Sequence, residues 1–283
     1  LPQRKIYDQF MHLLYGDQPA GWDIGGNKKI IKSLTRDQVV DFRSQNYLPQ
    51  ATALIIAGGF EDGILSQAAD LFSDMPAGTK ASKKGVVEKQ SSPQVSLKHK
   101  ESDQTHIRIG FRTFDMLDPR KYALKIMTDI LGGGMSSRLF HRIREQLGAA
   151  YYVGAEDDLY TDHGYIAASV GAEHSKVDQV LKAILEEFTR LKTELISGED
   201  LAKAKSHLSG SLLLGLETSN ALAVFYGTQE ILKEKVFTPE QLKEKLNSVS
   251  SKEIQNLAKK ILTPKSLNLA IIGPQKDSEH FQA

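Results

Sequence analysis

The 283-residue sequence contains no cysteine. This excludes disulfide bonds, thiolate catalysis and cysteine-ligated zinc or iron–sulfur sites. It does not fix the compartment, because a cysteine-free protein tolerates both the cytosol and the periplasm. No apolar run approaches the roughly 20 residues that a membrane-spanning helix needs. We therefore expect a soluble protein without a membrane span, cytoplasmic or periplasmic.

The sequence also lacks an excess of either charge. Its 36 basic and 35 acidic side chains leave a formal net charge of +1, which provides no electrostatic footprint for nucleic acid. Apolar residues make up 40% and charged residues 25%, as in an ordinary globular protein with a sizeable core. The chain starts with Leu1 rather than Met, and no signal-peptide apolar region follows, so we expect a processed chain or part of a longer one.

The most informative feature that is present is an internal repeat. The segments 33–58 and 248–273 align without gaps at a constant offset of 215 residues (248 minus 33). Each copy predicts a capped helix, a proline that ends it, an apolar strand at 53–57 or 268–272, and a closing glycine. The capping boxes are Thr35 with Gln38 and Ser250 with Glu253, and the prolines are Pro49 and Pro264. The alternative is that this common arrangement arose twice independently.

A duplication predicts how the chain is organised. Residues 1–80 would be the C-terminal part of a first unit, 81–92 a linker rich in Lys, Ser and Gly, and 93–283 a second unit. If the two units are equal in length, the first began roughly 120 residues before residue 1 and is truncated here.

Alternating and helical patterns predict the elements of the second unit. We expect strands at 105–114, 150–155 and 165–170, and a polar turn at 157–164 between the last two. Helices are expected from the Asp118-Pro119 cap to Gly132, from Ser136 or Ser137 to Gly148, at 176–195 and at 199–217. The predicted class is α+β, with tandem α/β units, an antiparallel-rich sheet and helices packed on one face.

Several other polar or glycine-rich patterns favour structural interpretations. Gly132–Gly134 reads as a helix end rather than a phosphate loop, because no strand precedes it and no Gly-Lys-Ser/Thr follows. His106 and Arg108 read as the polar face of a strand. Glu156, Asp157 and Asp158, with Asp162 and His163, read as the surface of a hairpin turn rather than a metal site.

Two longer segments carry a family resemblance. LGGGMSSRLFHRIREQLGAAYYVGA (131–155) and LLYGDQPAGWDIGG (13–26) resemble hallmark segments of the insulinase/pitrilysin-type zinc metallopeptidases, in the processing-peptidase-like branch. The resemblance covers nearly all of the chain. It implies two homologous α/β units that form half of a clamshell, with an inverted zinc motif, His-x-x-Glu-His, and a general-base Glu in the first unit.

That motif is missing from this sequence. None of its eight histidines begins or ends a His-x-x-Glu-His, and Val170 stands where Glu173-His174 would need the first His. The sequence therefore predicts no catalytic residue and no metal ligand in this chain. Zinc is expected for the full-length family member, and we interpret each lone histidine as a surface or core residue.

The resemblance also implies a substrate-binding pair. In active members, an Arg and a Tyr seven residues apart in the second unit reach the bound peptide, and Arg144 and Tyr151 have that spacing here. A guanidinium and a phenol can donate hydrogen bonds to peptide carbonyls or to a developing oxyanion. Without the resemblance, Arg144 would be a solvated helix residue and Tyr151 a core aromatic. Arg142 and Tyr152 are alternatives if the register slips.

These observations leave three hypotheses for function. The first is the C-terminal portion of a zinc endopeptidase subunit that helps to form the peptide-binding chamber but is not catalytic alone. The second is a zinc-less partner subunit of a heterodimeric peptidase, or a structural subunit like the core proteins of the respiratory bc1 complex. The third is an unrelated α+β binding module. The expected partners are peptide or unfolded polypeptide and, in a homo- or heterodimer, a zinc-bearing half.

Overall fold

The structure is a computed structural model that describes residues 1–79, 82–232 and 235–281. Contacts group the chain into two compact units, which we call the sheet unit and the helical unit. The sheet unit consists of Leu1–Asp23, Val86–Ser209 and Lys243–Ala283, and the helical unit consists of Ile24–Gly85 and Gly210–Leu242. This grouping differs from the division predicted from the repeat, because residues 1–23 pack with the sheet. The predicted boundaries of the duplicated sequence units stay a prediction.

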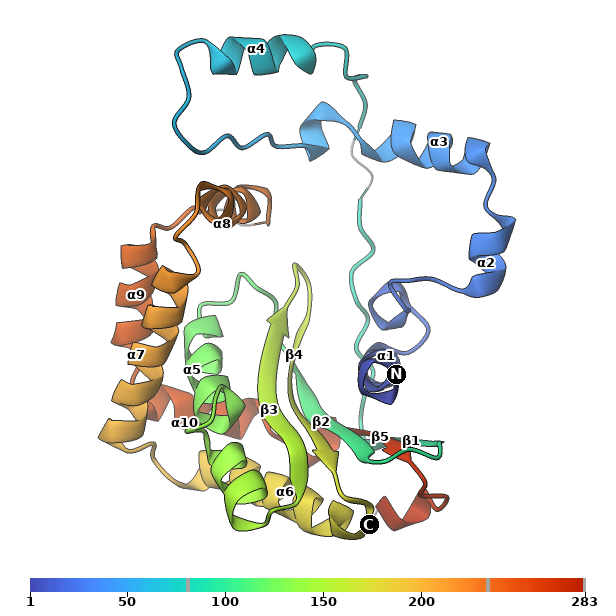
Figure 1. The fold of residues 1–283 in the computed structure, drawn as a ribbon, viewed down its shortest axis with the longest axis vertical. Coiled ribbons are helices and arrows are strands. Elements are labelled where there is room, and N and C mark those ends of the chain that lie inside the picture. Colours follow the sequence, from blue (N-terminus) through green and yellow to red (C-terminus); the bar gives the residue numbers. More distant parts are fainter. Residues whose placement is uncertain (80–81, 233–234, 282–283) are drawn as a thin grey trace. The chain divides into compact units, whose positions relative to one another are not determined.

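The sheet unit is built on a five-stranded sheet in the order β1-β5-β2-β4-β3 (Figure 1). β5 pairs with β1 in parallel, and the other three pairings are antiparallel. The α+β class with an antiparallel-rich sheet is therefore confirmed. The strands are β1 (Gln94–His99), β2 (Thr105–Thr113), β3 (Ala150–Leu159), β4 (Gly164–Ala172) and β5 (Leu267–Gly273). The helices of this unit are α1 (Pro2–Tyr15), α5 (Lys121–Gly132), α6 (Val177–Thr193) and α10 (Ser251–Ile261), while α7 (Gly198–Leu214) and α9 (Pro239–Ser248) extend into both units.

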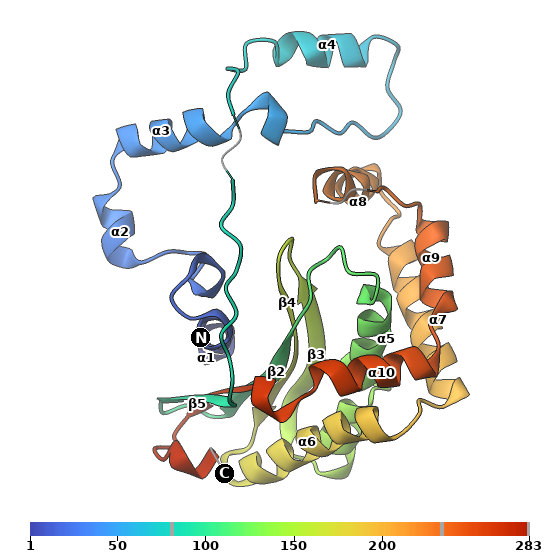
Figure 2. The ribbon, with the colours of Figure 1, turned by 180° about the vertical axis from the view of Figure 1, so that it is seen from behind.

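Three of these helices cover one face of the sheet. α10 packs against both α5 and α6, and Figure 2 shows α10 and α6 on the same side of the strands. Alternate residues of β2, namely Ile107, Ile109 and Phe111, point into this core, where Phe111 meets Phe188 of α6 edge to face at 5.1 Å. The period of two along β2 and the apolar stripe along α6 are what the sequence pattern predicts.

The opposite face is covered by α1, which the sequence did not predict. Ile6, Phe10 and Leu14 of α1 are buried against a second core that includes Tyr165 and Ile272 of the sheet. His106 and Arg108 were interpreted as the polar face of a strand, and they do lie on the face opposite Ile107. They are nevertheless buried, and the rings of Tyr7 and Phe10 from α1 lie against Arg108.

The predicted elements of the sheet unit are mostly present, with shifted ends. β2 agrees with the prediction, whereas β3 extends to Leu159, so the expected turn at 157–164 begins later. α5 begins at Lys121 rather than at Pro119, because Asp118 first accepts the backbone N–H of Arg120 at 2.8 Å. β1 was not predicted. The helix expected to end at Gly148 contains η3 (Phe140–Gln146), a π-helical segment.

The helical unit contains α2 (Lys28–Ser33), α3 (Arg36–Asn46), α4 (Ile64–Leu71) and α8 (Ser219–Leu232). α3 and α10, the two helices of the repeat, both begin with complete capping boxes, and both repeats continue into a short 3₁₀ turn at the proline. The predicted strand at 53–57 is wrong: these residues belong to no strand, because no described strand lies beside them to accept their hydrogen bonds. In the second copy, β1 and β2 flank β5.

Equivalent positions of the two copies differ in burial. Val39, Phe42 and Leu54 are 56%, 63% and 54% exposed, whereas Ile254, Leu257 and Leu269, each 215 residues later, are 0%, 3% and 6% exposed. The first copy thus keeps the capped helix and the proline turn of the second, but not its strand or the burial of its apolar side chains. The duplication itself stays a prediction.

No single described helix is long and apolar enough to cross a membrane, and α7 with α8 passes that test only as a sharply bent pair.

A close approach of α5 to β3 requires a glycine. Gly132 is the last residue of α5, and a Cβ there would lie 2.2 Å from the backbone nitrogen of Ala155. The interpretation of Gly132–Gly134 as a helix end is confirmed, with Gly133 as the cap.

We expect Gly132→Ala to lower the free energy of unfolding by about 1–3 kcal/mol, because the added methyl group overpacks this contact. Gly210→Ala is the matched control, since Gly210 lies inside α7 with no atom within 4 Å of its added Cβ. It should leave stability unchanged or raise it by up to about 1 kcal/mol. Denaturant unfolding of both variants measures the difference, and equal effects would contradict the close approach.

Candidate functional site

Arg144 lies in the π-helical segment η3. Its side chain is exposed, its guanidinium carbon lies 5.2 Å from the centre of the Phe140 ring, and it has no hydrogen bond or ion pair among the described residues. Single turns of π-helix are rare and occur frequently at functional sites. The guanidinium is therefore free to donate to a ligand.

Tyr151 lies at the beginning of β3, the strand at one edge of the sheet. Its side chain is exposed, and the pairing with β4 shifts register between Ala150 and Tyr152, which marks a β-bulge. Bulges next to sheet edges redirect side chains. An edge strand also presents unpaired backbone groups to which an extended peptide can add.

The two alternative residues are both occupied by structural contacts. Arg142 forms an ion pair with Glu186 and donates to Oε1 of the buried Glu187 at 3.0 Å. The Tyr152 hydroxyl lies 3.0 Å from Nδ1 of His106. The structure therefore distinguishes the two candidate pairs. The side chains of Arg144 and Tyr151 are exposed, whereas those of Arg142 and Tyr152 bond to neighbouring helices and strands.

Burial changes the acid–base behaviour of the Tyr152–His106 pair. It raises the pKa of Tyr152 to about 12 and lowers the pKa of His106, to which the nearby Lys100 also contributes. Both shifts favour the neutral forms, so the pair is an uncharged hydrogen bond between β2 and β3 near neutral pH.

A buried arginine joins three strands beneath α1. Arg108 of β2 forms an ion pair with Glu156 of β3 and donates to Ser169 at 3.0 Å and to the Tyr165 hydroxyl at 3.2 Å, both on β4. A buried charge needs such compensation, because desolvation otherwise costs several kcal/mol. This network accounts for Arg108 as a structural residue.

The acidic cluster lies in a strand, so its interpretation as a hairpin-turn surface is wrong for its first three members. Glu156, Asp157 and Asp158 belong to β3 and pair with Arg108, with Lys125 at 3.4 Å and with the Tyr160 hydroxyl at 2.7 Å. Alternate residues of a strand reach opposite faces of the sheet, so Asp157 with Lys125 lies on the face opposite Glu156 and Asp158.

The described residues of this chain do not form a zinc site. The sequence has no His-x-x-Glu-His, and within residues 1–79, 82–232 and 235–281 no three His, Asp or Glu side chains are placed to share a metal. His174, from the nearest partial motif, contacts the Thr105 hydroxyl and the Ser102 carbonyl, each at 2.8 Å.

Comparison with known families matches residues 33–208 to the family described as "Peptidase M16 inactive domain". The chain belongs to this peptidase M16 family. An uncharacterized zinc protease of Rickettsia felis is 32% identical over 280 residues, and one of Bacillus subtilis is 28% identical over 273. Each alignment covers 96% of this chain but 66% of the relative, so the chain spans slightly less than two thirds of their length.

Solved structures of low sequence identity share the fold of this M16 chain. A protease from Helicobacter pylori superposes with a TM-score of 0.87 at 16% identity, over 95% of this chain and 66% of that one. A chain of complex III from Candida albicans has a TM-score of 0.85 at 15% identity, over 98% of this chain and 69% of that one.

We expect Arg142→Ala to lower the free energy of unfolding by about 1–3 kcal/mol, because it removes a hydrogen bond to the buried carboxylate of Glu187 and the ion pair with Glu186. Arg144→Ala should change it by less than about 0.5 kcal/mol, since the side chain is exposed. Thermal and denaturant unfolding of the two single variants measure this contrast. If Arg144→Ala were less stable than Arg142→Ala, then Arg144 rather than Arg142 would be the structural residue, which would contradict the prediction.

The lowered pKa of His106 predicts a pH dependence of stability. Below the ordinary value of 6.5 the unfolded chain binds a proton that folded His106 does not, so the free energy of unfolding falls as the pH falls. His106→Gln should make this fall shallower between ~pH 7 and ~pH 5. His12→Gln, at an exposed position of α1, is the control for replacing a histidine that the fold does not bury. Parallel curves for wild type and His106→Gln would contradict the prediction.

Proposed function

We propose that this chain is the C-terminal portion of a zinc-dependent M16 endopeptidase subunit that contributes to the peptide-binding chamber and does not cleave peptides alone. One observation carries the proposal: relatives named zinc proteases align with 96% of the chain at 28–32% identity. The missing zinc ligands and general base would lie in the part of those relatives that this chain does not align with.

Exposed apolar side chains in the helical unit support this proposal. Val39, Phe42 and Leu54 occupy positions whose equivalents are buried in the sheet unit. Each fully buried side chain of this kind contributes about 1.5–3 kcal/mol. A first unit with its own sheet, related to the second by duplication, would cover these residues.

Arg144 and Tyr151 support a role in binding the substrate. A peptide carbonyl that leaves water for a binding chamber needs a replacement donor, and these side chains have no other hydrogen-bond partner among the described residues. The free edge of β3 beside Tyr151 can pair with an extended or unfolded polypeptide. In this role Arg144 and Tyr151 bind and orient the substrate, and they hold no metal.

A second candidate is a zinc-less partner subunit, either of a heterodimeric peptidase or in a structural complex. The fold similarity to a complex III chain of Candida albicans favours this alternative. In both cases we infer that a zinc-bearing half pairs with this one when cleavage occurs.

The test uses the full-length protein with its upstream part, and measures zinc content and cleavage of an unstructured peptide. We expect about one zinc per active site, and a roughly 10²–10³-fold loss of kcat/KM in Arg144→Ala if the guanidinium stabilises the oxyanion. Tyr151→Phe should lose activity as well. Zinc content and stability should remain at wild-type levels in both variants.

Matched controls separate binding from general surface effects. Arg4→Ala removes an exposed arginine of α1, and Tyr47→Phe alters a tyrosine that is 62% exposed, as Tyr151 is. Both should cleave at the wild-type rate. A full-length protein without zinc would favour the partner-subunit alternative, and full activity in Arg144→Ala would remove that residue from the site.

A further inference from the structure

The guanidinium of Arg144 lies against the aromatic ring of Phe140. The guanidinium carbon is 5.2 Å from the ring centre. This is within the roughly 6 Å over which the face of a ring attracts a cation. Both residues belong to η3 and are four positions apart, a spacing that places two side chains on the same side of a helix. No hydrogen bond or ion pair in the described part of the chain holds the guanidinium, so the ring is the contact that can fix its direction.

The segment that carries this pair is anchored in the core of the sheet unit. Leu139, directly before η3, and Ile143, inside it, are both fully buried. Phe140 is half-buried, whereas Arg144 is exposed. Burial restricts the rotamers of a side chain, and an exposed arginine keeps most of its rotamer freedom. The ring is therefore the more fixed partner, against which the arginine can be ordered.

Carboxylates close to Arg144 along the chain, or bound to the same segment, are held by other cations. Glu145 lies 2.5 Å from Nδ1 of His141, and Arg142 binds two carboxylates of α6. A carboxylate partner would neutralise the guanidinium and occupy its N–H donors. The Phe140 ring does neither, because it attracts the cation through its π face. The contact can thus order Arg144 while its donors stay available.

We propose that Phe140 is a positioning residue, whose ring holds the Arg144 guanidinium in the orientation from which it binds the substrate. The ordering of Arg144 stands on the contact alone, whereas its effect on catalysis rests on the proposed function. A flexible arginine loses rotamer freedom when it binds a ligand, and a ring that orders it beforehand lowers that cost. Phe140 acts through Arg144 in this role.

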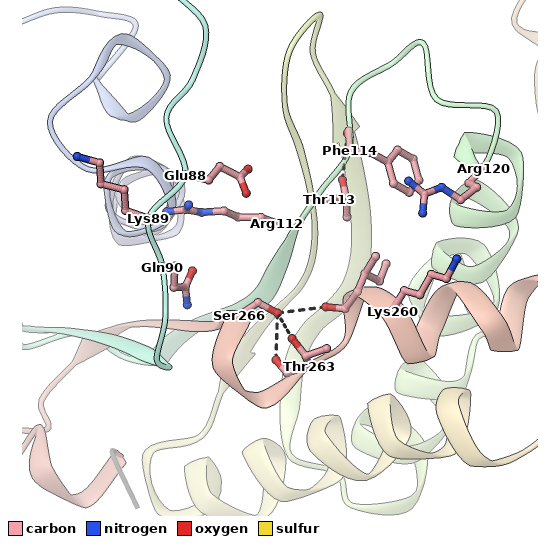
Figure 3. A pocket seen from close by; sticks show the side chains of 11 residues that line it. Glu88, Lys89, Gln90, Arg112, Thr113, Phe114, Arg120, Lys260, Thr263 and Ser266 are labelled. Carbon is pink, nitrogen blue, oxygen red and sulfur yellow. Dashed lines mark hydrogen bonds between the residues drawn. The ribbon is translucent and has the colours of Figure 1, made fainter.

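A second pair of a ring and an arginine provides the comparison. The guanidinium carbon of Arg120 lies 4.6 Å from the centre of the Phe114 ring, and Figure 3 shows the two side chains together. Arg120 is held in addition by the carboxylate of Asp118, with Nε 2.9 Å from Oδ1. Loss of the Phe114 ring should therefore leave Arg120 ordered, whereas loss of the Phe140 ring should release Arg144.

The first experiment measures the order of the arginine Nε–H groups in this chain by NMR relaxation. Phe140→Leu keeps an apolar side chain and removes the π face. It should lower the order of Arg144, with a roughly two- to fivefold fall in the ratio of held to free guanidinium, the effect of one exposed cation–π contact. Phe140→Tyr restores the ring and should keep the wild-type order. Phe114→Leu is the control and should leave the order of both Arg144 and Arg120 unchanged.

Phe140→Met is a second variant without a ring, and it replaces Phe140→Leu if leucine at this position impairs folding. Denaturant unfolding of each variant shows whether the fold is intact. Equal order of Arg144 in the wild type and in the folded variant without the ring would overturn the proposal.

The second experiment is a double-mutant cycle in the full-length protein with its upstream part. Phe140→Leu should lower kcat/KM roughly two- to fivefold, and Phe140→Tyr should restore it. In the Arg144→Ala background Phe140→Leu should have no further effect, because the ring then has no guanidinium to hold. Phe114→Leu should cleave at the wild-type rate. An equal loss with and without Arg144 would show that Phe140 acts by itself, and it would overturn the positioning role.

The two experiments distinguish this proposal from the proposed function. Full activity of Arg144→Ala would contradict the proposed function, while the NMR order would still decide whether Phe140 holds the guanidinium. Unchanged order of Arg144 in Phe140→Leu, together with a large loss of activity in Arg144→Ala, would refute the positioning role and leave the proposed function in place.

Discussion

β5 lies between β1 and β2, so the sheet joins residues 94–99, 105–113 and 267–273, which are far apart in the sequence. β1 has no other strand partner among the described residues, and α10 reaches its place over the sheet through β5. The same strand holds the segment 88–90 in place, through the bonds of Gln90 to Leu267 and Asn268. The burial of the core on this side of the sheet follows from this one long-range pairing.

The two copies of the repeat show what that pairing contributes. Both carry a capping box and a proline turn, because these depend on residues three to five positions apart. In the second copy, neighbouring strands satisfy the backbone and cover the apolar side chains. In the first copy, no described strand lies beside 53–57, and the apolar face of α3 is exposed. Local structure is thus retained where the tertiary layer is missing.

Four arginines differ in whether a carboxylate neutralises the guanidinium, and this difference separates structural residues from candidate functional ones. Arg108 and Arg142 are paired with carboxylates and hold strands or helices together. Arg144 is exposed to solvent, and Arg112 is partly buried, with no hydrogen-bond partner for its Nε and Nη1 among the described residues. A cation that the fold does not neutralise is available to a ligand, whereas a paired one is already part of the framework.

The sequence by itself determined the α+β class, the caps of α3 and α10, most elements of the sheet unit and the family resemblance. These rest on short periodic patterns and on residue types at fixed spacing. It also selected Arg144 and Tyr151, through the resemblance and not through periodicity. Only the tertiary structure decided that α1 covers Arg108, that His106 is buried, and that Glu156, Asp157 and Asp158 lie in β3. Those facts depend on contacts between distant segments, and no local pattern records which segment will cover a polar face.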